Sequence, residues 1–193
     1  MDYEDPGWLP SLRYAIPFVS PFLMHSPRFR DRTNPLVSMR GIILSHVVSL
    51  FALLIPLLFV AGGLERHRSA AFALLIIGDA ALAAAGVSQV RRRPFDTRSE
   101  TDLAAQYRGL LFIGIGLVES IALVGFVGVF VTGHLWTYLL GMALSLAGFA
   151  AIAPTRRDIE RRQARLDEAG TALSLGRALT EPASGGGGAS GVS

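Results

Sequence analysis

Four long apolar runs dominate the pattern of hydrophobic and polar positions along the chain. They occupy residues 41–62, 70–90, 109–132 and 134–153. Each is about 20 residues long and nearly free of charge, which is the length that a helix needs to cross a bilayer. The pattern predicts an all-α fold, an integral membrane four-helix bundle over residues 41–153. Pro56 is expected to kink the first helix, because its ring removes one backbone hydrogen bond.

The segments outside the apolar runs differ from one another in composition. Residues 1–40 interleave proline, aromatic and arginine residues, which predicts a cytoplasmic or interfacial arm, and contact with anionic lipid is favoured over a simply disordered arm. Residues 154–178 read as a charged, solvent-exposed cytoplasmic helix, with Asp158 and Arg162 at i,i+4 spacing. Residues 179–193 are rich in glycine and serine and predict a flexible tail. No cleavable signal peptide is visible, so the first apolar run is expected to act as an uncleaved anchor.

The arginine distribution predicts the orientation of the chain. Five arginines lie in residues 1–40, five in the predicted loop 91–108 and six after residue 153, against two in residues 63–69. Positively charged loops stay in the cytoplasm. We therefore expect a multi-pass protein of the inner or plasma membrane with both termini in the cytoplasm.

Composition excludes several classes of protein. Of 193 residues, 51% are hydrophobic and 17% charged, too apolar for a compact soluble enzyme. The absence of cysteine excludes disulfides, thiolate metal sites and thiol catalysis. The net charge of +3 comes from arginines that flank apolar runs, so we expect a lipid bilayer rather than nucleic acid as the partner. No catalytic motif is apparent, and we expect no enzyme activity, catalytic residue, cofactor or metal.

Two acids and one histidine lie inside the apolar runs, away from their ends: Asp79, Glu119 and His46. Counted from Arg91 and Arg108, both acids lie roughly 16–18 Å inside their helices, near the bilayer midplane. Carboxylates at this depth mark ion pathways by default, so Asp79 and Glu119 are the candidate proton- or ion-binding residues. They are expected to approach each other, with at least one protonated at neutral pH. The alternative is a neutral carboxyl that hydrogen-bonds across helices. His46 is assigned a structural role.

Small residues predict the helix contacts. Gly114, Gly125, Gly128 and Thr132 fall on one stripe of the third run, and Glu119 lies roughly 140° away from it. A stripe of small residues lets another helix approach closely, so Glu119 is expected to face a different neighbour. The second run carries Gly78 and Gly86 with five alanines between them. These positions are assigned to helix packing, within the chain or in an oligomer.

Residues 116–123, with the sequence GLVESIAL, resemble the carboxylate helix of the proteolipid subunit c of rotary ATP synthases. The glycine- and alanine-rich stretch 78–86 and the Arg93-Pro94 pair that opens a polar loop are also similar, so the resemblance covers about residues 70–132. It implies that Glu119 carries the ion and that the alanine-rich helix packs innermost. The chain departs from that family in its second acid, its longer loop and its additional helix at each end.

Two functions remain open from the sequence. The first is an accessory or scaffold subunit of a membrane complex, as a homo-oligomer or with a membrane-protein partner. The second is a proton- or cation-translocating protein, similar to subunit c, that uses Glu119. An intramembrane enzyme built on Asp79 and Glu119 lacks any flanking signature.

Overall fold

The part of the chain that the structure describes folds into helices. The computed structural model describes residues 5–14, 34–64, 67, 70–95 and 99–180, and these residues contain no β-strand. Four helices among them are long and apolar enough to cross a membrane. They are α3 (Pro35–Val60), α4 (Ala70–Arg92), α5 (Glu100–Thr132) and α6 (Leu135–Ile152). The all-α class and the four membrane-length helices predicted from the sequence are thus confirmed.

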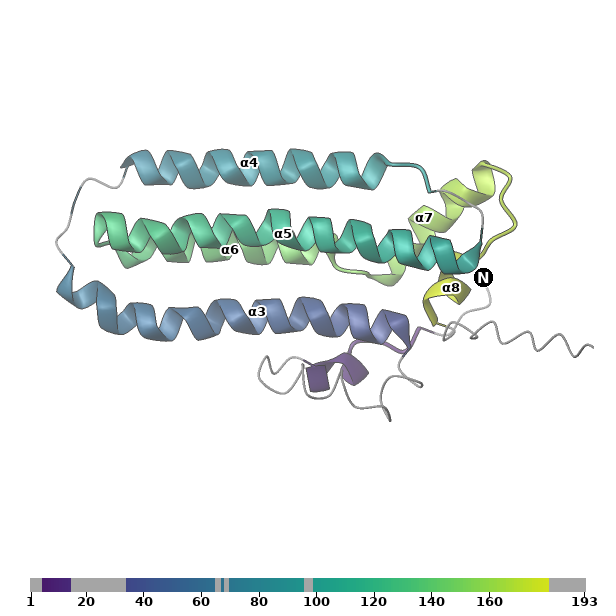
Figure 1. The fold of residues 1–193 in the computed structure, drawn as a ribbon, viewed down its shortest axis with the longest axis horizontal. Helices are drawn as coiled ribbons and strands as arrows, with labels where there is room; N and C mark the ends of the chain where they lie inside the picture. The colour runs from purple at the N-terminus through teal and green to yellow at the C-terminus, as the bar shows by residue number, and fades with distance from the viewer. Residues whose placement is uncertain (1–4, 15–33, 65–66, 68–69, 96–98, 181–193) are drawn as a thin grey trace, which may run out of the picture.

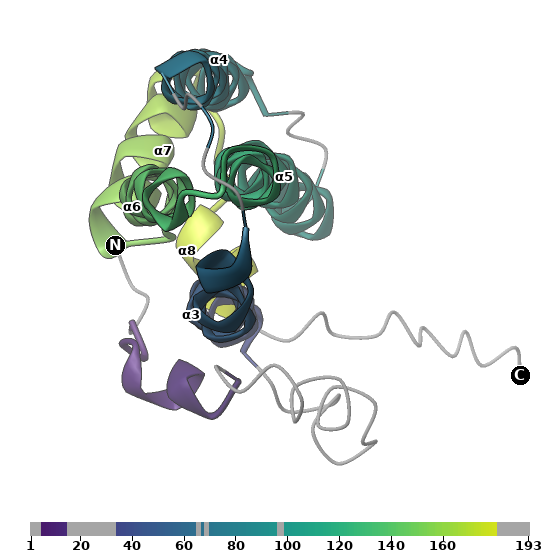
Figure 2. The same cartoon turned by 90° about the vertical axis from the view of Figure 1, so that its left-hand side faces the viewer.

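The four long helices lie side by side, with α5 and α6 in the centre (Figure 1). The end view shows α4 on one side of this central pair and α3 on the other (Figure 2). Helices α7 (Arg156–Glu168) and α8 (Leu175–Thr180) cover one end of the bundle. We call it the arginine-rich end, since Arg91, Arg92, Arg162, Arg165 and Arg177 lie there. The short η1 (Leu9–Tyr14) packs against α3.

Two helices begin earlier than their apolar runs. Helix α3 starts at Pro35, after Asn34, whose side chain accepts a hydrogen bond from the Leu36 amide at 2.9 Å. Helix α5 starts at Glu100 rather than Gly109, because Ser99 caps it by accepting from the Asp102 amide at 3.1 Å. The connection between α4 and α5 is therefore shorter than the loop expected over 91–108. Helix α3 continues through Pro56 to Val60.

The charged segment 154–178 holds α7 and the start of α8 rather than one helix. Helix α8 runs on to Thr180, so the first two residues of the predicted flexible tail 179–193 are helical. Helix α7 is capped by Thr155, buries Ile159 and Leu166, and is followed by Gly170 in the left-handed region at φ +73°. Helix α8 then returns to α5, where Arg177 Nε donates to Glu100 Oε1 at 3.0 Å. The end of the tail, residues 181–193, and most of the N-terminal arm, residues 15–33, lie outside the described residues.

The backbones of α5 and α6 touch through glycine. A Cβ atom on Gly125 would lie 2.7 Å from the carbonyl oxygen of Thr137, and one on Gly141 would lie 2.7 Å from that of Ile121. Gly133, at φ +69°, ends α5 in the left-handed conformation that glycine adopts without strain, so that α6 turns back at once. This contact holds the central pair together at close range.

We expect Gly125→Ala to destabilise the bundle by roughly 1–3 kcal/mol, because the added methyl meets backbone atoms that must move. The matched control is Gly116→Ala on the same helix, where no described atom beyond the local helix backbone lies within 4 Å of the added Cβ. Unfolding of the purified protein in detergent, followed by circular dichroism, measures both. Equal stability of the two variants would contradict the close α5–α6 contact.

Candidate functional site

The first polar contact in the middle of the bundle joins α3 to α5. His46 Nδ1 lies 3.2 Å from Glu119 Oε2, and the two side chains are 29% and 31% exposed. The imidazole also stacks on the ring of Phe149 from α6, with centroids 6.2 Å apart. His46, which the sequence left without a partner, is therefore the direct neighbour of Glu119.

The second polar contact joins α4 to α5. The Ser120 hydroxyl lies 3.0 Å from Asp79 Oδ2 and 2.9 Å from the carbonyl oxygen of Leu117, one turn earlier on its own helix. Asp79 thus contacts Ser120, the residue of α5 that directly follows Glu119.

The two acids do not share a site. Glu119 and Ser120 are consecutive residues of α5, so their side chains point about 100° apart around the helix axis. Glu119 contacts His46 of α3, and Asp79 contacts Ser120 on the side that faces α4. The mutual approach of Asp79 and Glu119 expected from their common depth is replaced by two separate contacts on different faces of α5.

The glycines assigned to packing occupy different environments. Added Cβ atoms at Gly125 and Gly128 would lie 2.7 Å and 3.0 Å from Thr137 of α6, and one at Gly114 would lie 3.5 Å from Ile152. A Cβ added at Gly86 would lie 2.8 Å from the Leu117 side chain, whereas one added at Gly78 would have no described atom of another element within 4 Å. The stripe on α5 therefore faces α6, while Glu119 of the same helix faces α3.

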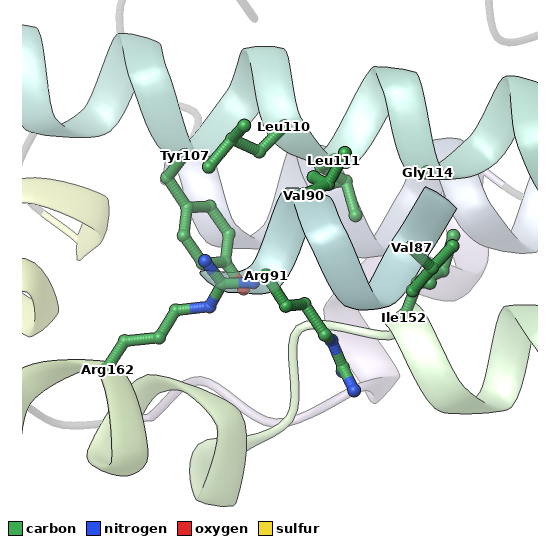
Figure 3. Close-up of a pocket in the computed structure, with 9 residues that line it drawn as sticks. All are labelled: Val87, Val90, Arg91, Tyr107, Leu110, Leu111, Gly114, Ile152 and Arg162. Atoms are coloured by element: carbon green, nitrogen blue, oxygen red, sulfur yellow. The ribbon is translucent and has the colours of Figure 1, made fainter. Parts of the chain in front are cut away.

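A cluster of charged and aromatic side chains closes the arginine-rich end. Asp158 accepts from the Tyr107 hydroxyl at 3.2 Å and from Arg162 Nε at 2.9 Å, and Arg91 Nη2 lies 3.4 Å from it. The Arg162 guanidinium also lies over the Tyr107 ring, 5.0 Å from its centroid. In Figure 3 the Arg162 side chain reaches the Tyr107 ring, while the Arg91 side chain extends away from that ring. The cavity that they line has a volume of about 20 Å³, about the size of one water molecule.

Arg40 is the most deeply buried charged side chain in the described part of the chain, at 1% exposure. Its Nη1 and Nη2 donate to the two Asp5 carboxylate oxygens at 2.5 Å and 2.9 Å, and its Nε donates to the carbonyl oxygen of Pro154 at 3.1 Å. The guanidinium lies 5.1 Å from the ring of Trp8. Arg40 therefore joins the N-terminal arm, α3 and the α6–α7 connection.

This guanidinium favours the charged form of Asp5. Hydrogen bonding to Arg40 holds the pKa of Asp5 below its ordinary value of 3.8, against the opposing effect of partial burial. The Asp5–Arg40 pair is consequently ionised on both sides at neutral pH.

No group of three or more potential metal ligands occurs among the residues that the structure describes. Comparison with protein-family models, curated proteins and solved structures finds no match to this chain. The arrangement of the side chains is therefore the basis for any functional conclusion.

Several of these residues were missed by sequence reasoning. Gly141 and Gly148 of α6 approach α5 as closely as the predicted glycines, and their spacing around Ser145 is a signal of the same kind. Tyr107 lies on the early turns of α5, which the apolar pattern does not reveal. The burial of Arg40 has no signal in the sequence, because its partners lie 35 and 114 residues away.

We expect the Asp5–Arg40 contact to be fully formed above pH 3.8 and lost as the pH falls through the lower pKa of folded Asp5. Trp8 reports the contact, because its ring lies against Arg40. Its fluorescence is measured in a Trp136→Phe background, which removes the only other tryptophan. The predicted change is a red shift of Trp8 emission below pH 3.8.

Asp5→Asn is the control for this titration. It leaves the buried Arg40 without its counter-charge, so Trp8 emission is expected to be red-shifted already at neutral pH. A transition at the same acidic pH in Asp5→Asn would show that another group controls the arm.

Proposed function

We propose that this chain is a multi-pass protein of the inner or plasma membrane that serves as an accessory or scaffold subunit of a membrane complex. In this proposal the arginine-rich end lies in the cytoplasm, together with both termini. The orientation is supported by the gathering of α7, α8 and the ends of α4 and α6 at one end of the bundle. Positive charge is retained on the cytoplasmic side of a membrane.

One observation carries the scaffold role: each acid in the middle of the bundle is bound to a side chain of a neighbouring helix. Glu119 contacts His46, and Asp79 contacts Ser120. Polar contacts of this kind fix helix pairs within a bilayer. Hydroxyls add to them, since Tyr138 donates to the carbonyl oxygen of Leu50 at 2.6 Å and Ser145 to that of Val118 at 2.8 Å.

The outer faces of the bundle favour lipid or a membrane partner. Large apolar side chains are exposed along the outer helices: Phe51, Ile55, Leu58 and Phe59 on α3, and Leu74, Leu75, Ile77 and Leu82 on α4. At the arginine-rich end, α7 buries Ile159 and Leu166 and exposes arginines on its opposite face. We propose that these surfaces contact the bilayer and either further copies of the chain or a membrane-protein partner.

A second candidate, proton or cation translocation, is favoured by the His46–Glu119 contact. Imidazole and carboxylate groups exchange protons readily, and each of these two side chains is about a third exposed. The resemblance of residues 116–123 to subunit c assigns the ion to the same carboxylate. In this candidate Glu119 takes up the proton and His46 positions or relays it.

Double-mutant cycles in detergent unfolding test the scaffold role. The pairs His46→Asn with Glu119→Gln and Asp79→Asn with Ser120→Ala are each expected to show coupling of about 0.6–1.7 kcal/mol. The matched control cycle pairs His46→Asn with Asp79→Asn, whose effects are expected to add because they lie in different contacts.

Proton flux into liposomes that contain the purified protein separates the two candidates. The scaffold role predicts the same flux for wild type, Glu119→Gln and protein-free vesicles. Flux above that of protein-free vesicles that is abolished by Glu119→Gln and kept by Asp79→Asn would reject the scaffold role in favour of translocation.

A further inference from the structure

A groove runs between α4, α5 and α6 from the middle of the bundle to the arginine-rich end. Its volume is about 500 Å³, within the range of ligand-binding pockets in proteins. Small and aliphatic side chains line most of it: Ala80, Ala83, Ala84 and Val87 of α4, Val118 and Ile121 of α5, and Leu144, Gly148, Ala151 and Ile152 of α6. The alanines help to create this space, because a larger side chain at an exposed position such as Ala84 would occupy it.

Three arginines stand at one end of this groove. Arg91 and Arg92 of α4 and Arg165 of α7 complete its lining, with Ser88 as the other polar residue. The same three arginines line a second pocket of about 310 Å³, which also includes Arg93 and Arg162. Neither lining contains an acidic residue.

Two of the arginines are held in place by main-chain atoms. Arg91 donates through Nη2 to the carbonyl oxygen of Ala151, and Arg165 Nη1 donates to that of Arg91 at 3.1 Å. Asp158 neutralises part of this charge, since it contacts Arg91 and Arg162. Arg92 forms no ion pair with any residue that the structure describes. The mouth of the groove therefore keeps an excess of positive charge.

We propose that the groove binds one anionic phospholipid, with an acyl chain between the three helices and the phosphate at Arg91, Arg92 and Arg165. The separation of a long apolar section from a cationic end matches an amphiphile with one anionic end. Basic pockets between membrane helices on the cytoplasmic side bind such headgroups. The inference depends on the membrane location of the chain and is independent of the scaffold role.

The dimensions agree with this occupant. From Ala80 to Arg92, helix α4 rises roughly 18 Å. Half of the hydrocarbon core of a bilayer is about 15 Å thick. A lipid of the cytoplasmic leaflet whose phosphate meets the arginines thus places its chain along the apolar part of the groove.

The test uses the full chain purified in mild detergent, with bound lipid counted by native mass spectrometry and the unfolding temperature measured in parallel. Phosphatidylglycerol is compared with phosphatidylcholine of the same acyl chains and with inorganic phosphate. We expect one retained phosphatidylglycerol, at least fivefold tighter binding than phosphatidylcholine, and a higher unfolding temperature with phosphatidylglycerol alone.

Variants separate the two halves of the site. Ala84→Leu fills the apolar section and is expected to abolish retention. Arg92→Gln and Arg165→Gln are each expected to weaken phosphatidylglycerol binding about fivefold, the effect of one arginine near a lipid phosphate. Matched controls are Ala85→Leu and Arg161→Gln, which alter exposed positions of α4 and α7 outside both linings and are expected to bind as wild type does.

Three outcomes would overturn the proposal. Equal binding of the two lipids, or equal effects of site and control variants, would identify ordinary lipid contact. Stabilisation by inorganic phosphate as large as that by phosphatidylglycerol would identify a site for small anions. A change of oligomeric state in Ala84→Leu, with lipid retention intact, would assign the groove to a second copy of the chain. None of these outcomes alters the His46–Glu119 coupling, so the scaffold role is tested separately.

Discussion

The close approach of α5 and α6 is the constraint on which the rest of the bundle depends. Where Gly125 and Gly141 meet, neither helix has room for a side chain, so this face fixes the rotation of both helices. With α5 rotated in this way, Glu119 faces α3 and Ser120 faces Asp79 of α4. The two outer helices are then attached to the central pair through polar contacts and aliphatic packing. The separation of the two acids follows from the glycine contact.

Polar side chains in this protein act at two levels. In the middle of the bundle they form separate contacts, each of which joins two helices. At the arginine-rich end they form a network in which Asp158 joins α7 to Tyr107 of α5 and Arg91 of α4. The arginine-rich end is thus held together by more polar contacts between helices than the middle of the bundle is. The groove proposed to hold lipid begins in the apolar middle and ends beside this network.

The apolar runs allowed the four long helices to be predicted, because a length of uncharged residues is visible without any knowledge of contacts. The early starts of α3 and α5 were missed, since their first turns are polar and depend on capping by Asn34 and Ser99. Asp79 and Glu119 were predicted to approach each other because they lie at the same depth in the bundle. Depth does not determine how each helix is rotated about its own axis. The partner of each acid, His46 or Ser120, is decided by that rotation, which three-dimensional packing sets.

Arg40 links parts of the chain that are made at very different times. It lies 35 residues after Asp5 but 114 residues before Pro154, whose carbonyl oxygen it binds. The ribosome therefore produces Asp5 and Arg40 together, whereas the third partner emerges only after the last long helix is complete. Until then the guanidinium has one hydrogen-bond acceptor fewer than in the finished protein. The Arg40–Pro154 hydrogen bond thus forms late in biosynthesis. It requires that the end of α6 lie on the same side of the bundle as Arg40.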